Sequence, residues 1–281
     1  MRTLLLTCVA MLAFAANSLL CRLALVDARI DPASFGLLRL ASGALALTLI
    51  VRWRTNTAAR YAADWWAAVM LFAYVALFSF AYLSLSASVG ALILFGAVQM
   101  TMIGAGLRAG ERFAPVAWAG LATAIAGLVY LVSPGLTAPP AAGAASMALA
   151  GVAWGVYSLR GRGVADALAS TASNFVRAAL PALALSLVTI GQATADGVGV
   201  ALAIASGALT SGIGYVIWYA ALRGLPAMRA ASVQLSVPPI AALGGVLVLS
   251  EPLTSRLIVA SAAILGGIAV VLFVRARSAT R

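Results

Sequence analysis

The chain consists of long apolar stretches separated by short polar segments. Each stretch holds about 20 residues, and a helix of that length, which rises about 1.5 Å per residue, crosses a hydrocarbon core of roughly 30 Å. The pattern therefore predicts an all-α polytopic membrane protein with ten transmembrane helices, five in each half of the chain. We expect these helices at residues 3–25, 33–51, 65–84, 87–107, 113–132, 145–162, 169–190, 198–222, 228–249 and 254–274.

The two halves of the chain repeat one pattern at a separation of 140 residues. Arg22 corresponds to Arg162, and Glu111 corresponds to Glu251. Because each repeat holds an odd number of spans, the second copy should be inverted relative to the first. Inverted repeats are typical of alternating-access transporters, whose substrate site lies near the middle of the membrane. We expect the first five-helix repeat at residues 1–137 and the second at residues 138–281.

Composition and charge place the chain in a membrane. The hydrophobic fraction is 64% and the mean hydropathy is +1.07, which excludes a soluble domain of this length. All 18 basic residues are arginines, and 13 of them fall in segments on the same side as the N-terminus. The positive-inside rule then predicts a multi-pass protein of the cell inner membrane with both termini in the cytoplasm. The net charge of +11 is thus explained without nucleic acid, which we do not expect as a partner.

Several kinds of chemistry have no residues to support them. The chain has no His and only two Cys, so we expect no metal and no cofactor. It has no phosphate-binding glycine loop and no nucleophile–base pair, so we expect neither ATP hydrolysis nor enzymatic activity. All seven acidic residues fall in loops or at span ends, which leaves no counter-charge for a cation at mid-membrane. A neutral or zwitterionic solute fits this pattern better.

Two pairs of motifs resemble a known family. Residues 35–42 (FGLLRLAS) and 175–179 (FVRAA) resemble the Arg-bearing second helix of EamA-type members of the drug/metabolite transporter superfamily. Residues 110–113 (GERF) and 250–254 (SEPLT) resemble the family's junction between the fourth and fifth helices of each repeat. The resemblance implies two inverted five-helix repeats around a central cavity in an exporter of metabolites or drugs. Within the family, the chain most resembles exporters of aromatic and neutral amino acids.

A few polar and aromatic residues lie deep inside the predicted spans. A binding cavity needs a mostly apolar wall with a few placed donors and acceptors. Aromatic faces cover an apolar side chain, and hydroxyls and amides bind a carboxylate. An aromatic belt at the membrane surface is the alternative for Tyr82 or Tyr219. The predicted cavity residues are Asn17, Tyr74, Phe78, Tyr82, Gln99, Trp154, Tyr157, Ser158, Tyr215, Trp218, Tyr219 and Gln234.

A second set of residues is expected to have gating or structural roles. Arg39 and Arg177 are expected either to have a structural role, capping neighbouring helix ends or anchoring at the membrane surface, or to contact substrate. The two glutamates of the repeat are expected to accept hydrogen bonds at helix N-termini and to stabilise gates. Two consecutive prolines are expected to kink the ninth span, as a static bend or as a hinge. The set comprises Arg39, Glu111, Arg177, Pro238, Pro239 and Glu251.

The sequence therefore predicts a secondary transporter that exports small neutral or zwitterionic metabolites, chiefly aromatic and other apolar amino acids. The lipid bilayer and a small-molecule substrate are the expected partners, and we consider a monomer as the working unit. A multidrug exporter of the same fold is one alternative. A nontransporting membrane scaffold or a lipid flippase is another.

Overall fold

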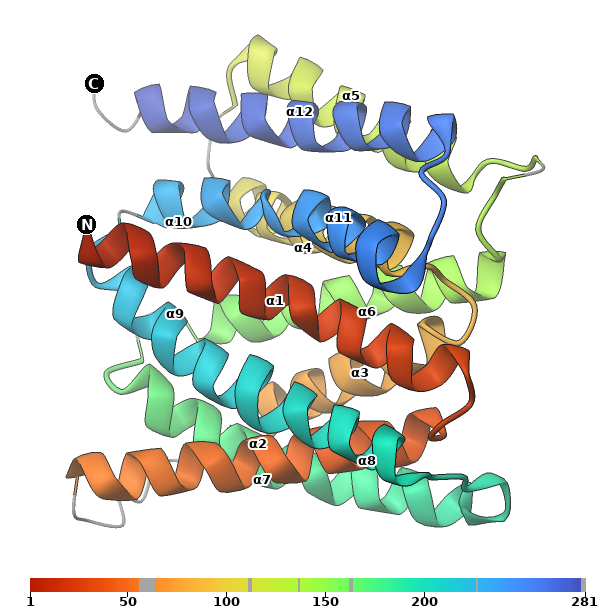
Figure 1. Ribbon diagram of the computed structural model, residues 1–281. Coiled ribbons are helices and arrows are strands. Elements are labelled where there is room, and N and C mark those ends of the chain that lie inside the picture. The colour runs from red at the N-terminus through yellow and green to blue at the C-terminus, as the bar shows by residue number, and fades with distance from the viewer. Residues whose placement is uncertain (56–63, 111–112, 136, 162–163, 226, 279–281) are drawn as a thin grey trace.

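The computed structural model describes residues 1–55, 64–110, 113–135, 137–161, 164–225 and 227–278. They form a bundle of helices with both chain ends on the same side (Figure 1). The first half forms α1 (Arg2–Val26), α2 (Pro32–Thr55), α3 (Trp65–Ala81), α4 (Ala87–Arg108) and α5 (Pro115–Val132). The second half forms α6 (Ala141–Arg160), α7 (Ala167–Val188), η1 (Ile190–Gln192), α8 (Gly197–Ile204), η2 (Ala205–Ile213), α9 (Gly214–Leu222), α10 (Ala227–Gln234), α11 (Val237–Leu249) and α12 (Ser255–Ser278).

The predicted all-helical membrane fold is confirmed. Among the described residues, nine helical segments are long and apolar enough to cross a membrane. The third predicted span corresponds to α3, which has 17 residues and is shorter than these. The observed bounds agree with the predicted ones to within a few residues at most helix ends.

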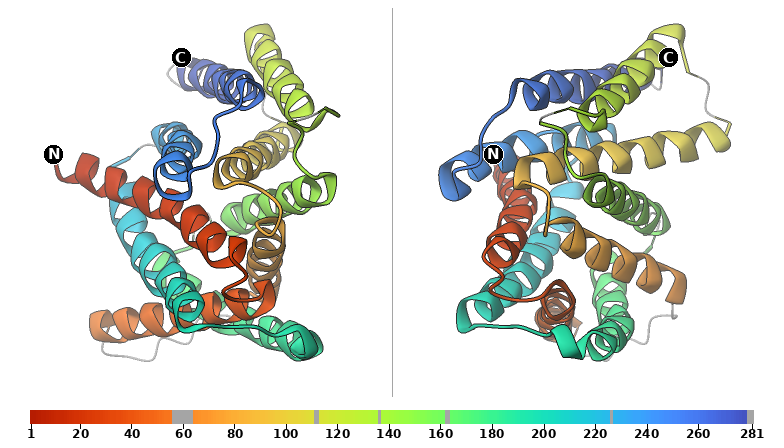
Figure 2. Two further views of the ribbon diagram at one scale, coloured as in Figure 1. Left: turned by 45° about the vertical axis from the view of Figure 1, so that its right-hand side comes forward. Right: turned by 90° about the vertical axis from the view of Figure 1, so that its right-hand side faces the viewer.

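The packing relates the two halves of the chain. α2 packs on α7, α4 on α11 and α5 on α12, so each of these helices contacts its counterpart in the other half. α3 packs against α6, and α1 packs against α9 (Figure 2). In both pairs, the first span of one half contacts the third span of the other half. The α5–α12 contact is close because Gly120 faces Gly267, where an added Cβ would lie 2.4 Å from the Gly120 carbonyl oxygen.

The eighth predicted span is not a regular α-helix. Its central segment η2 is π-helical and joins α8 to α9. π-helical turns are rare and occur frequently at functional sites. η2 packs against α1 and α2, and its side chains Ser206 and Ser211 are buried there. This irregular segment therefore brings hydroxyl groups into the middle of the bundle.

The predicted kink at Pro238 and Pro239 is wrong in its position. The helix is interrupted before the prolines, because α10 ends at Gln234 and α11 begins at Val237. The two prolines occupy the first turn of α11, where a missing backbone N–H costs no helical hydrogen bond. They start a new helix after a short turn rather than bending the middle of a continuous one.

Candidate functional site

Two ion pairs connect helix ends at the end of the bundle that contains Arg54, Arg160 and Arg223, here called the arginine-rich end. Asp64 caps α3 by accepting a hydrogen bond from the Ala67 N–H at 3.0 Å, and it also accepts one from Arg160 Nε at 3.0 Å. Burial raises the pKa of Asp64, but the hydrogen bonds from Ala67 and Arg160 outweigh it and leave that pKa below its ordinary value. Arg54, at the end of α2, pairs with Asp166.

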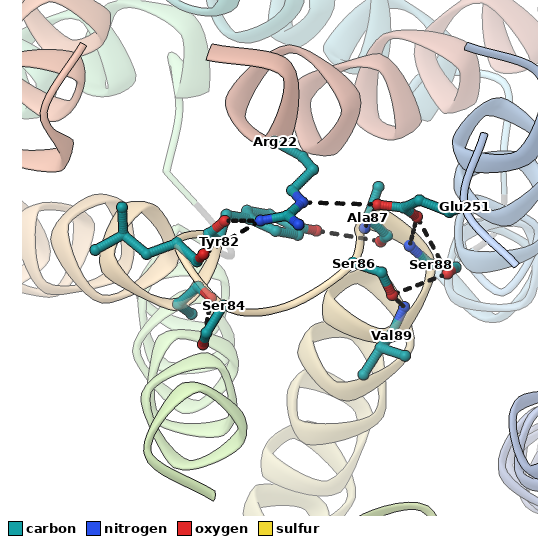
Figure 3. Close-up of polar contacts among 10 residues, drawn as sticks. Arg22, Tyr82, Ser84, Ser86, Ala87, Ser88, Val89 and Glu251 are labelled. Carbon is teal, nitrogen blue, oxygen red and sulfur yellow. Dashed lines mark hydrogen bonds and ion pairs between the residues drawn. The ribbon is translucent and has the colours of Figure 1, made fainter. Parts of the chain in front are cut away.

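A polar cluster around Glu251 connects helix ends at the opposite end of the bundle (Figure 3). Glu251 Oε1 accepts a hydrogen bond from the Ala87 N–H at 2.8 Å, at the N-terminus of α4, and Oε2 accepts from the Ser88 N–H at 3.4 Å. Arg22 Nε lies 3.7 Å from Glu251 Oε1, and Arg22 Nη1 donates to the Tyr82 carbonyl oxygen at 2.8 Å. We call these five residues the Glu251 clasp. It joins α1, the end of α3, the start of α4 and the loop before α12.

A cavity of about 1230 Å³ extends from the arginine-rich end into the middle of the bundle. Its mouth includes Arg54, Asp64 and Arg160, and its deep part includes Ser18 and Phe78. No side chain of the Glu251 clasp lines it. Among the described residues, the lining of the cavity therefore runs from the arginine-rich end to the middle of the bundle and stops before the clasp.

Several aromatic side chains line the deep part of the cavity. Trp154 lies at their centre, with ring centroids 4.9 Å from Tyr74, 5.3 Å from Tyr157 and 5.6 Å from Tyr215. Such rings offer broad apolar faces, and their polar groups fix the orientation of a ligand. The aromatic chamber comprises Phe14, Tyr74, Phe78, Trp154, Tyr157, Tyr215, Trp218 and Tyr219.

A buried hydrogen-bonded cluster lies against this chamber and joins four helical segments. The Ser206 hydroxyl donates to Asn17 Oδ1 at 2.5 Å, and Asn17 Nδ2 donates to the Tyr74 hydroxyl at 3.5 Å. Arg39 Nη2 donates to the same Tyr74 hydroxyl at 3.0 Å, and Arg39 Nε donates to the Ser211 hydroxyl at 3.3 Å. These five residues are the Arg39 cluster. It links α1, α2, α3 and η2 at the depth of the cavity.

Ten of the twelve predicted cavity residues line the cavity. Tyr82 does not, because its ring is fully buried against Phe78 and its hydroxyl donates to the Ala87 carbonyl oxygen at 3.4 Å. Gln99 is buried in α4 outside the cavity, and its Nε2 has no hydrogen-bond partner in the described residues. The aromatic-belt alternative fails for both tyrosines, since Tyr219 lines the cavity and its hydroxyl lies 2.8 Å from that of Thr171. The ten are Asn17, Tyr74, Phe78, Trp154, Tyr157, Ser158, Tyr215, Trp218, Tyr219 and Gln234.

The predicted gating residues occupy different environments. Arg39 is 1% exposed, so it does not reach the membrane surface as the anchoring alternative required. Arg177 is partly exposed, hydrogen bonds to Ser173 and lies over the ring of Trp65, with Cζ 5.8 Å from the ring centroid. Glu251 binds a helix N-terminus that belongs to the other half of the chain. Glu111 lies outside the described residues.

Several polar residues that line the cavity were not predicted from the sequence. Thr171 and Asn174 of α7 line it, and the Tyr157 hydroxyl donates to Thr171 at 3.4 Å. Thr210 and Ser211 of η2 also line it. Polar residues three to five positions apart within otherwise apolar spans were the available signal, because such residues avoid lipid and face the bundle interior.

Comparisons with known proteins agree with this architecture. Residues 141–273 match the model of the EamA-like transporter family. An uncharacterized protein of Pseudomonas aeruginosa is 54% identical over 280 residues, which cover 100% of this chain and 98% of that one. A protein crystal structure with 19% identity matches with a TM-score of 0.69 over 96% of each chain, and this likeness concerns the fold alone. The chain belongs to the EamA-like transporter family, whose members are membrane transporters.

Proposed function

We propose that this transporter exports small neutral or zwitterionic metabolites, chiefly aromatic and other apolar amino acids, across the bacterial inner membrane. The two halves of the chain act as inverted repeats that open the cavity alternately to each side. The arginine-rich end faces the cytoplasm in this proposal, in keeping with the positive-inside rule.

One observation carries the proposal: among the described residues, a large cavity with aromatic walls is lined by side chains of the arginine-rich end and by none of the Glu251 clasp. The volume of about 1230 Å³ exceeds what an amino acid requires and leaves space for water. The Glu251 clasp joins helix ends at the other end of the bundle, and none of its five residues lines the cavity. This arrangement corresponds to the state in which an exporter takes up its substrate from the cytoplasm.

The charges in the cavity favour a neutral or zwitterionic substrate over a cationic drug. Asp64 and Asp166 line the cavity only at its mouth, and each pairs with an arginine. The deep part of the cavity lies against Arg39, a positive charge. A lipophilic cation would find aromatic faces there but no carboxylate to compensate its charge.

Efflux from proteoliposomes tests this function. Vesicles containing the purified full chain are loaded with radiolabelled phenylalanine, leucine or glutamate, and efflux is followed with and without a proton gradient. We expect saturable efflux of phenylalanine and leucine, and little efflux of glutamate. Tetraphenylphosphonium should compete weakly.

A matched pair of tryptophan variants locates the pathway. Trp154→Ala removes the central ring of the chamber and should lower phenylalanine efflux at least tenfold. Trp118→Ala removes a ring that is 50% exposed on α5, away from the cavity, and should leave efflux unchanged. Absence of efflux for every amino acid, combined with efflux of the phosphonium cation, would replace the proposal by a multidrug exporter.

A further inference from the structure

Arg39 carries a buried charge that no described residue neutralises. Its side chain is 1% exposed, and it forms no ion pair among the described residues. The rings of Tyr74 and Phe78 give partial compensation, with their centroids 5.1 and 5.0 Å from Arg39 Cζ. A charge within a membrane span is costly without a partner, and such residues therefore mark binding sites or ion pathways.

The groups around Arg39 have an excess of donors. Arg39 Nη1 has no hydrogen-bond partner in the described part of the chain. The Tyr74 hydroxyl accepts hydrogen bonds from both Arg39 and Asn17, and the Ser211 hydroxyl accepts one from Arg39. Neither hydroxyl donates to any acceptor among the described residues, so the protons of both remain available.

Tyr74 and Ser211 both line the cavity, whereas Arg39 lies directly behind them. Both hydroxyls are within hydrogen-bond distance of one guanidinium, so they lie close together. A donating surface backed by a positive charge has the chemistry of an anion site. Because no described residue accepts a hydrogen bond from these two hydroxyls, a ligand is expected to supply the acceptor.

We propose that the Arg39 cluster binds the carboxylate of the transported solute. The hydroxyls of Tyr74 and Ser211 donate to the carboxylate oxygens, and the guanidinium of Arg39 supplies the compensating charge behind them. The side chain of the solute then lies in the aromatic chamber next to Trp154, whose ring centroid is 4.9 Å from that of Tyr74. This inference rests on the proposed function and specifies it: the substrates are carboxylates with an apolar or aromatic side chain.

Matched ligands test the inference by binding alone. Isothermal titration calorimetry on the purified full chain compares L-phenylalanine, 3-phenylpropionate and 3-phenylpropionamide, of which the amide lacks the charge. Wild type should bind both carboxylates at least tenfold more tightly than the amide, the range of a hydrogen-bonded charge.

Variants assign the preference to the cluster. Tyr74→Phe and Ser211→Ala each remove one hydroxyl and should reduce the ratio of carboxylate to amide affinity severalfold. Arg39→Gln should bind carboxylate and amide with equal affinity. If this variant fails to fold, the two hydroxyl variants still test the proposal. Tyr130→Phe removes a hydroxyl from an exposed ring of α5 outside the cavity and should retain the wild-type ratio.

The outcomes separate this inference from the proposed function. One contrary result is a wild type that transports amino acids and yet binds 3-phenylpropionate and its amide with equal affinity. That result would overturn the carboxylate site but not the proposed export function. The carboxylate site would also be overturned if Tyr74→Phe and Ser211→Ala both kept the wild-type ratio of carboxylate to amide affinity. If no ligand binds and no amino acid is transported, both proposals fail.

Discussion

Arg22 and Glu251 come from opposite halves of the sequence, and their side chains form an ion pair with Nε 3.7 Å from Oε1. Glu251 also accepts hydrogen bonds at the N-terminus of α4, where the helix dipole favours a negative charge. One carboxylate thus joins the first span, the fourth span and the loop before the last one. This contact lies at the end of the bundle that the cavity does not reach.

Replacing Glu251 should loosen that closed end. Glu251→Gln removes the charge that holds Arg22 and the α4 N-terminus, and we expect a loss of about 1–3 kcal/mol of stability. The measurement is the Tm of the detergent-solubilised protein, which should fall by several degrees. Asp27→Asn removes one of the two carboxylates that pair with Arg29, at a site where it is 54% exposed, and should change stability by less than about 0.5 kcal/mol. Equal Tm shifts for the two variants would contradict the role of the clasp.

The π-helical segment should tolerate no side chain at its closest contact with α2. An added Cβ on Gly207 would lie 2.0 Å from Ser42 Oγ and 2.2 Å from the Arg39 carbonyl oxygen. Gly207→Ala should therefore push η2 away from α2 and cost about 1–3 kcal/mol, seen as a lower Tm. Gly104→Ala in α4 meets no atom within 4 Å and should be neutral or slightly stabilising. A Tm that is unchanged in Gly207→Ala would show that α2 and η2 are not packed as described.

The ion pair at the cavity mouth should contribute a specific pH dependence. The pKa of Asp64 is lowered from its ordinary value of 3.8, so its contribution to stability is fully present above that value. It is lost as the pH falls through the lowered pKa of the folded state. The Tm of Asp64→Asn should therefore lie below that of wild type at neutral pH, and the difference should shrink in acid. A difference that grows below pH 4 would contradict this sign.

Most of the fold could be predicted from the sequence because membrane spans depend on simple requirements. Apolar length sets the helices, and polar residues within spans must face the interior. That second requirement correctly indicated Asn17, Tyr74 and Trp154. It could not distinguish a cavity wall from a packed interior, which is why Tyr82 and Gln99 were placed in the cavity.

Other features depended on the three-dimensional arrangement. The π-helical turn at Ala205–Ile213 has no marker in the apolar pattern, although it determines which hydroxyls face Arg39. The depth of Arg39 within α2 was compatible with a side chain that reaches the membrane surface. Only the positions of Tyr74 and Ser211 show that it points inward. For the two prolines, the sequence predicted a kink within one helix, whereas the helix is interrupted before them and a new one begins at Val237.

Side-specific labelling of the cavity tests the central claim most directly. Ser158 lines the cavity, so Ser158→Cys, in a chain whose Cys8 and Cys21 are replaced by Ala, introduces one thiol there. A membrane-impermeant maleimide is applied to inverted vesicles and to spheroplasts, which expose opposite faces of the membrane. We expect rapid labelling in inverted vesicles, slow labelling in spheroplasts, and protection by phenylalanine. Rapid labelling in spheroplasts alone, or labelling that saturating phenylalanine does not slow, would contradict a substrate cavity that opens to the cytoplasm.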